Sequence, residues 1–158
     1  MSRTAMPTHE DAQLVLRLYE LRRDEKLRDA RNWFNSTFLP TSIDEIREVI
    51  LGRTQENTYF RMVVSYWDMA ASFIEYGVMN GELFLESSGE MLLVWAKIEQ
   101  FVPQIRQELD LPSYLVNIEK VIARSQWAQE RLRWYHKRID ERKAAARHAP
   151  AAGPESGS

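Results

Sequence analysis

The side chains of this sequence that could perform acid–base or metal chemistry are its carboxylates and its three histidines. A two-metal site in a helical bundle combines inward-facing glutamates with a Glu-x-x-His pair on each of two helices. No glutamate stands three residues before His9, His136 or His148. Glu82, Glu86 and Glu90 are spaced four residues apart. They would share a helix face only if one helix continued through Gly89. The sequence therefore predicts no metal site and no cofactor.

Nucleophilic catalysis has no sequence signature either. The chain contains no cysteine, so it has no thiol nucleophile and no thiolate metal ligand. It lacks a Gly-x-Ser-x-Gly elbow and a glycine-rich phosphate loop. A carboxylate in a cleft could still act as a general acid or base. We predict no catalytic residue, and an enzyme with an unrecognised carboxylate site remains one alternative.

Tryptophan and arginine alternate at helical spacing near the C-terminal end of the sequence. This tryptophan–arginine row consists of Trp127, Arg131, Trp134 and Arg138. An arginine one turn from an exposed tryptophan can stack on its ring, which contributes roughly 0.5–1 kcal/mol. Both residue types are enriched where proteins meet. The row is a candidate interface that could pack on its own chain, form a homodimer contact or, least favoured, stack on nucleic-acid bases.

A second row of interest interrupts an otherwise apolar segment, YFRMVVSYWDMAASFIEY at positions 59–76. This polar row consists of Arg61, Ser65, Asp68, Ser72 and Glu75. At 100° per residue its members occupy an arc of about 80° on a helix. Such an apolar helix is expected at the centre of a bundle. The row is then its solvent edge, a buried seam in which Asp68 pairs with an arginine, or the lining of a ligand pocket.

The elements that must position these residues are all predicted to be helices. Apolar residues recur at helical spacing, and capping residues, prolines and glycines mark the ends. Thr8 with Asp11 begins the first helix, and Ser42 with Glu45 begins the second. Asn57 is the predicted N-cap of the third. The expected helices cover positions 9–38, 43–51, 58–76, 82–88, 90–101 and 113–147.

The last predicted helix carries a narrow apolar seam at alternating spacings of four and three. The seam comprises Val121, Ser125, Ala128, Leu132, Tyr135 and Ile139. A helix of about 35 residues is about 50 Å long, whereas a domain of this size has a radius of gyration near 15 Å. A single helix over 113–147 would extend beyond its own domain. This geometry predicts self-association, as a homodimer.

Composition sets the broad class. The 158 residues are 44% hydrophobic and 28% charged, as expected for a globular domain. Positions 44–110 hold twelve acids and five bases, whereas positions 124–147 hold eight bases and three acids. The longest apolar run, MLLVWA, is far shorter than the roughly 18 residues of a membrane span. We predict a cytoplasmic all-α antiparallel bundle of five or six helices with a long C-terminal helix. It comprises a flexible N-terminus at 1–7, one helical domain at 8–147 and a disordered tail at 148–158.

The sequence resembles a known family over positions 66–106. The matching features are YWDMAASFIEYGVMNGELF, then Gly89, Trp95 and the segment FVPQIR. They resemble a family of small, mostly helical bacterial proteins of unknown function. The resemblance implies a helical architecture and transfers no catalytic residue.

These features together predict a non-catalytic, cytoplasmic interaction or regulatory module that forms a homo-oligomer. Three alternatives belong to other classes. They are a small-molecule-binding helical sensor, a nucleic-acid-associated protein that uses the basic C-terminal helix, and an enzyme with a carboxylate site.

Overall fold

The computed structural model describes residues 5–150, and all regular secondary structure within them is helical. The elements are α1 (His9–Leu21), α2 (Glu25–Ser36), α3 (Ile43–Leu51), α4 (Gln55–Glu75), α5 (Gly81–Ser87), α6 (Gly89–Ile98), η1 (Glu99–Phe101), α7 (Val102–Glu108), α8 (Val116–Arg124) and α9 (Gln126–His148). The predicted all-α class is confirmed. The predicted count of five or six helices is not, because the two longest predicted helices are both broken. Positions 1–4 of the predicted flexible N-terminus and 151–158 of the predicted tail lie outside the described residues.

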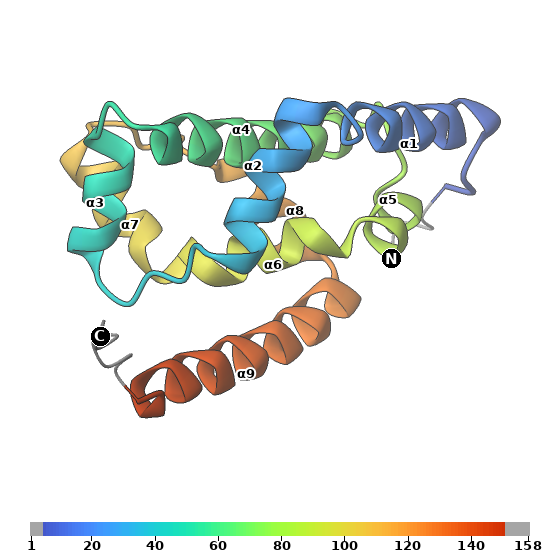
Figure 1. Cartoon of the computed structure of the whole chain (residues 1–158). Coiled ribbons are helices and arrows are strands. Elements are labelled where there is room, and N and C mark those ends of the chain that lie inside the picture. Colours follow the sequence, from blue (N-terminus) through green and yellow to red (C-terminus); the bar gives the residue numbers. More distant parts are fainter. Residues whose placement is uncertain (1–4, 151–158) are drawn as a thin grey trace.

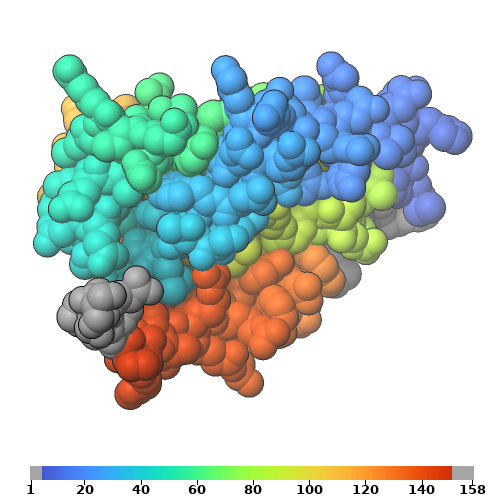
Figure 2. All heavy atoms as spheres, viewed as in Figure 1, coloured from blue at the N-terminus to red at the C-terminus, as the bar shows by residue number. Residues whose placement is uncertain are grey.

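The helices lie in layers, with α4 at the top of Figure 1, α6 in the middle and α9 at the bottom. Helices α1 and α2 cover α4 on one side, and α8 lies behind it in this view. In the space-filling view α9 forms the lower layer of the molecule (Figure 2). The tryptophan–arginine row therefore belongs to an outer layer, and the polar row belongs to the central helix α4.

Helices α4 and α8 run in the same direction, unlike neighbours in the predicted antiparallel arrangement. The Asp68 carboxylate of α4 meets the N-terminal end of α8 at Ile118. Two turns further along α4, Glu75 pairs with Arg124 in the last turn of α8. Helices α5 to α7 carry the chain back between the two, which makes the parallel pairing possible (Figure 1).

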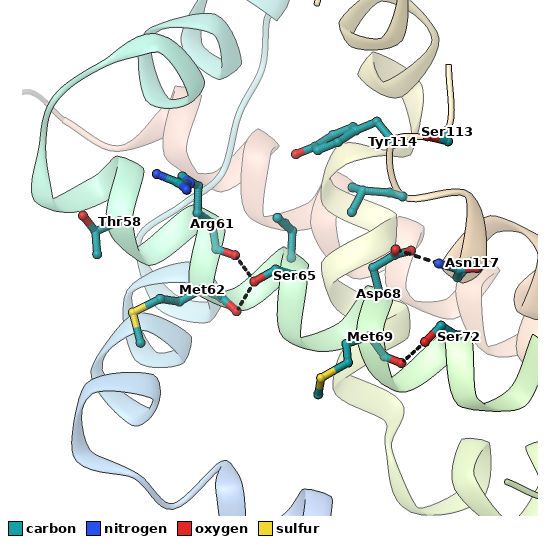
Figure 3. A pocket seen from close by; sticks show the side chains of 12 residues that line it. Thr58, Arg61, Met62, Ser65, Asp68, Met69, Ser72, Ser113, Tyr114 and Asn117 are labelled. Atoms are coloured by element: carbon teal, nitrogen blue, oxygen red, sulfur yellow. Dashed lines mark hydrogen bonds between the residues drawn. The ribbon is translucent and has the colours of Figure 1, made fainter. Parts of the chain in front are cut away.

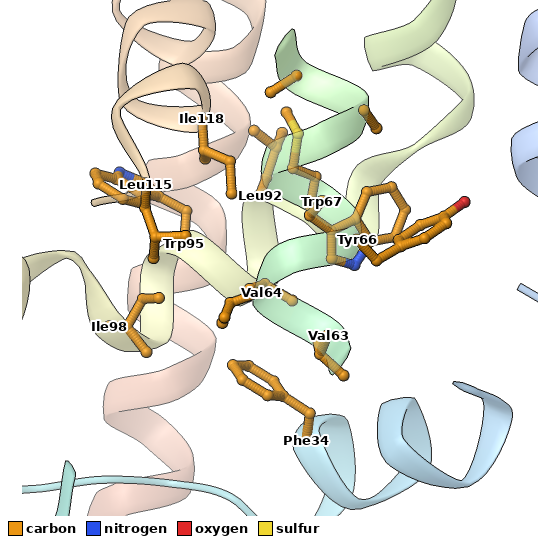
Figure 4. Close-up of a cluster of buried hydrophobic side chains, with 14 of the residues drawn as sticks. Phe34, Val63, Val64, Tyr66, Trp67, Leu92, Trp95, Ile98, Leu115 and Ile118 are labelled. Atoms are coloured by element: carbon orange, nitrogen blue, oxygen red, sulfur yellow. The ribbon is translucent and has the colours of Figure 1, made fainter. Parts of the chain in front are cut away.

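The core forms where α2, α4, α6 and α8 meet (Figure 4). Trp67 is only 1% exposed, and Phe34, Leu92 and Ile118 are fully buried. Burying a side chain of this size contributes roughly 1.5–3 kcal/mol. Helix α4 is therefore the central helix that its apolar sequence predicts, and its side chains on this face are Phe60, Val63, Val64, Tyr66, Trp67, Ala70 and Ala71.

The predicted helix over 9–38 is wrong, because the chain turns at positions 22–24. The Asp24 carboxylate accepts hydrogen bonds from the backbone N–H groups of Lys26 and Leu27, at 3.1 and 3.2 Å, and so begins α2. The Arg31 guanidinium donates to the carbonyl of Arg22 at 3.1 Å and holds the end of α1. An N-cap and a tertiary contact together outweigh the continuous helical pattern.

The predicted helix over 113–147 is also wrong. Ser125 is extended, with φ −110° and ψ 113°, and its hydroxyl oxygen accepts a hydrogen bond from the N–H of Ala128 at 3.1 Å. The chain reverses there, and α9 lies alongside α6 instead of extending beyond the domain (Figure 1). Helix α9 therefore does not overhang its domain, and its length gives no reason for self-association.

Several predicted boundaries are confirmed. Thr8 and Asp11 form a reciprocal capping box, Ser42 begins α3, and Gly77 follows α4 with a left-handed φ of 70°. The N-cap of α4 is Thr54, not Asn57 as predicted. The Asn57 amide instead donates to two carbonyls in the last turn of α3, at 2.8 and 2.9 Å.

Candidate functional site

The tryptophan–arginine row lies on the outer face of α9. Trp127 is 42% exposed and Trp134 is 44% exposed. The Cζ atoms of Arg131 and Arg138 lie 4.6 and 5.2 Å from the centroid of the Trp134 ring. Trp134 therefore has a guanidinium on either side along the helix, and all three side chains remain open to solvent.

Trp127 has different surroundings from Trp134. It lines a cleft of about 610 Å³ between α9, α5 and the ends of α4 and α8. Leu85, Val121 and Arg124 are among the other residues of this cleft. The structure thus places Arg131 and Arg138 beside Trp134, and places Trp127 at a separate cleft.

The inner face of α9 holds the helix against its own chain. Ala128 and Ile139 are buried, and the Tyr135 hydroxyl approaches Gly89 so closely that a Cβ there would lie 3.1 Å away. Arg142 donates to the carbonyls of Asn35 and Ser36 in α2, at 3.0 and 2.9 Å. His136 contacts Glu99, just beyond α6. The apolar seam is therefore used within the chain, whereas the tryptophan–arginine row faces outward.

The polar row lines an open groove of about 890 Å³ between α4 and the chain at 113–117 (Figure 3). Four of its members line this groove: Arg61, Ser65, Asp68 and Ser72. The row is most exposed at its N-terminal end and is half-buried from Asp68 onward. Glu75 lies outside the groove and pairs with Arg124 at 2.8 Å. The row is therefore neither a plain solvent edge nor a fully buried seam.

Asp68 caps α8 from another helix. One carboxylate oxygen accepts from the N–H of Ile118 at 3.2 Å, and the other accepts from the amide of Asn117 at 2.9 Å. Leu115, the residue before α8, has a left-handed φ of 55° and supplies no side-chain cap. A carboxylate at a helix N-terminus satisfies free N–H groups and the helix dipole. Pairing of Asp68 with an arginine is one of the three alternatives for this row; the structure shows Asn117 and Ile118 as its partners instead.

Two further residues of the family-like segment converge on the same turn. Arg106, at the end of FVPQIR, donates to the carbonyl of Tyr114 and to the carboxylate of Glu119, both at 2.9 Å. Trp95 is 5% exposed and packs near Leu115 (Figure 4). These residues hold the turn that starts α8, so the segment 66–106 has a structural reason for its pattern.

The buried polar site that the sequence analysis missed is built on Lys97. This side chain is 1% exposed. Its ammonium donates to the carbonyls of Phe34, Asn35 and Phe38, at 2.5, 3.1 and 2.8 Å. Burial, with a smaller effect of the nearby Arg142 charge, lowers the pKa of Lys97 to about 7. One lysine within an apolar helical segment carries no signal of such a contact.

The acids considered as metal ligands are separated. Glu90 forms a two-pronged pair with Arg31, with N–O distances of 2.7 and 2.6 Å, and this pair joins α2 to α6. Among residues 5–150, no group of three or more side chains is arranged to hold a metal ion.

In the same part of the chain, no helix has both the length and the apolar character that crossing a membrane requires.

Comparison with known proteins places the chain in a family. No curated protein and no solved structure matches it. Residues 7–127 match a family model described as Domain of unknown function (DUF4760). The resemblance predicted from positions 66–106 is thus confirmed, and the match extends from α1 to the first turn of α9. The chain therefore belongs to the DUF4760 family, a family defined by a domain of unknown function.

Proposed function

We propose that this protein is a non-catalytic interaction module of the cytoplasm that works as a homodimer, with the tryptophan–arginine row as part of its contact surface. The observation that carries the proposal is the setting of Trp134. Its indole is 44% exposed, although guanidiniums of Arg131 and Arg138 lie on either side of it. A large aromatic ring held in place but open to solvent is typical of an interface anchor.

The energetics support an interface of this kind. Exposed indole area gains roughly 25 cal/mol per Å² when it is removed from water. The stacked arginines restrict the ring before binding, so less side-chain entropy is lost on association. Removal of a central tryptophan from an interface commonly costs at least about 2 kcal/mol.

The charge around the row favours a protein partner over nucleic acid. Arg138 lies 3.6 Å from Glu141, and Asp140 is exposed on the same helix. A nucleic-acid surface needs a basic groove that follows the phosphates. Acids interspersed among the bases of α9 weaken such a track.

The test is the oligomeric state of the full chain and of two variants, Trp134→Ala and Tyr76→Ala. Light scattering and sedimentation over concentrations from micromolar to hundreds of micromolar should show a dimer. Trp134→Ala should weaken dimerisation about tenfold or more. Tyr76→Ala is the matched control, because Tyr76 is 82% exposed and lies at the end of α4. A monomer at all these concentrations, or equal effects of the two variants, would refute the proposal.

A second candidate function, small-molecule binding, is favoured by the groove along α4. The Arg61 guanidinium and the Tyr114 hydroxyl lie toward the same end of this groove (Figure 3). Met62 and Met69 provide apolar surface beside them, and Arg61 has no ion pair within residues 5–150. This combination suits a small organic acid with an apolar body.

Octanoate and octanol are suitable probes for this second function. Octanoate should raise the melting temperature of the full chain, and octanol should raise it much less. Arg61→Gln should remove the octanoate effect, whereas Arg53→Gln, an exposed arginine outside the groove, should leave it unchanged. Equal shifts with both probes, or an unaffected Arg61→Gln variant, would exclude the groove as an acid-binding site.

A further inference from the structure

The seam of the C-terminal region continues without interruption through the break between α8 and α9. Val121, Ser125 and Ala128 keep the alternating spacing of four and three across the junction. Positions 113–147 contain neither glycine nor proline. Local sequence alone therefore supports one helix through Ser125, and such a helix is what the sequence predicts.

The structure breaks this helix at a single residue. Ser125 is the only residue between α8 and α9, and its extended backbone reverses the chain. The bent form gains the cap that Ser125 provides to Ala128 and the contacts of α9 on α6. The straight form would gain the backbone hydrogen bonds that the reversal interrupts. The bent and the straight conformation thus differ at one hinge residue, and each is stabilised by contacts that the other lacks.

Straightening at Ser125 would take α9 away from its own domain. The carbonyls of Asn35 and Ser36 would lose Arg142, and Glu99 would lose His136. Helix α6 would lose its cover. Most of its residues are buried, including Trp95 and Lys97. The surface that fits such a displaced α9 is the same surface on a second copy of this chain.

We infer that two copies exchange α9: in the dimer, α8 and α9 of each chain form one straight helix through Ser125, and α9 lies on α6 of the other copy. This inference rests on the proposed homodimer and specifies how it forms. The contacts of α9 with α6 and α2 are then kept between chains, whereas those with α8 at the hinge, such as the bond from Gln129 to the carbonyl of Ala123, are lost, so the two forms differ mainly at the hinge. The family match ends at residue 127, within the first turn of α9, which agrees with α9 being a separable element.

Three hinge variants distinguish the bent form from the straight form. Gln126→Pro fits the bent form, because Gln126 is the first residue of α9 and proline favours an extended residue before it. In a straight helix the same proline would lose a backbone hydrogen bond and clash with the carbonyl of Ile122. Ser125→Ala removes the cap that stabilises the bend. Gln126→Ala is the control, because it loses the same side-chain bond to Glu130 as Gln126→Pro but permits both forms.

Exchange of α9 predicts that Gln126→Pro and Ser125→Ala have opposite effects on dimerisation. Gln126→Pro should weaken the dimer at least about tenfold, because an interior proline disrupts the straight helix that only the dimer contains. Ser125→Ala should strengthen it by up to about tenfold, because two caps that oppose straightening are lost. Gln126→Ala should stay within about threefold of the parent chain.

A disulfide between copies tests the exchange directly. The parent chain has no cysteine, so single cysteines can be placed at will. A copy with Glu99→Cys and a differently tagged copy with His136→Cys are co-expressed and then oxidised, because these two side chains touch in the structure. Exchange should yield a disulfide-linked pair carrying both tags. Gln126→Pro in both copies should abolish it.

The outcomes separate the inference from the proposed function. A dimer that forms no disulfide between copies and is insensitive to Gln126→Pro, but dissociates with Trp134→Ala, overturns the exchange and leaves the homodimer in place. A monomer in all variants overturns both. The linked pair together with the effect of Gln126→Pro supports the exchange.

Discussion

Lys97 is the residue whose environment most departs from what its type suggests. Its three N–H donors meet three carbonyls around the C-terminal end of α2, where the helix dipole favours a positive charge. Arg142 donates to the neighbouring carbonyls from α9. Two cations from different helices therefore satisfy the carbonyls that α2 leaves without partners.

The lowered pKa of Lys97 predicts how stability depends on pH. The pKa is 10.5 in the unfolded chain and about 7 in the folded protein, so between these values unfolding takes up a proton. Stability should therefore rise as pH increases from 7 to 9, by on the order of 2 kcal/mol. Urea unfolding at pH 7, 8 and 9 measures this rise. The pKa values of Tyr66 and Tyr114, both raised to about 12 by burial, affect stability only above this range.

Substitution of Lys97 tests whether this residue causes the rise in stability with pH. Lys97→Met should remove the rise between pH 7 and pH 9 and should also destabilise the fold, because three carbonyls lose their donor. Lys120→Met, at an exposed position on α8, should keep the parent pH profile. A profile in Lys97→Met that still rises with pH would show that another group is responsible.

Asp68 gives a second prediction at this scale. Asp68→Ala should destabilise the protein by about 2 kcal/mol, because it leaves the N-terminus of α8 without a cap. Ser65→Ala, one turn away on the same row and exposed, should cost less than about 0.5 kcal/mol. Urea unfolding of the two variants provides the comparison. Equal losses would mean that the contact of Asp68 with α8 contributes nothing particular.

At the scale of elements, capping and tertiary contact decide where helices end. Asp24 and Ser125 each interrupt a segment whose pattern continues as a helix. In both cases the change of direction lets the next helix pack against others: α2 on α4, and α9 on α6. The cap itself contributes only about 1 kcal/mol, so the packing of the reoriented helix must supply the rest.

The attachment of α9 can be measured by hydrogen exchange. Arg142→Ala should increase the exchange of α9 amides by about tenfold while α4 amides stay unchanged, because Arg142 links α9 to α2. Arg147→Ala is the control, since within residues 5–150 the Arg147 guanidinium donates to the carbonyl of Lys143 in its own helix and forms no bond to α2. If α9 and α4 lose protection together in Arg142→Ala, α9 is part of one cooperative unit and not a separable cover.

At the scale of the whole molecule, the distribution of charge bears on self-association. The basic α9 lies beside α6, so part of the acidic middle of the chain faces the basic end within one fold. The outward tryptophan–arginine row keeps Arg131 and Arg138 exposed. Contact between two such rows would bring like charges together.

Salt should therefore strengthen the dimer if the two rows meet. Raising NaCl from about 50 to about 500 mM shortens the screening length and reduces the repulsion between arginines. Sedimentation should show a dissociation constant lower by a few-fold at high salt. A dimer weakened by salt would indicate that the row faces an acidic surface instead. Binding of nucleic acid would likewise weaken with salt.

The sequence by itself determined the all-helical class, the family and the boundaries at Thr8, Ser42 and Gly77, because caps and glycine turns act within a few residues. It also identified the polar row and the tryptophan–arginine row as faces of single helices. Only the tertiary structure decided the breaks at Asp24 and Ser125, the burial of Lys97, the use of Asp68 as a cap and the outward direction of Trp134. Each of these depends on which helix from a distant part of the sequence packs alongside, and no local pattern contains that information.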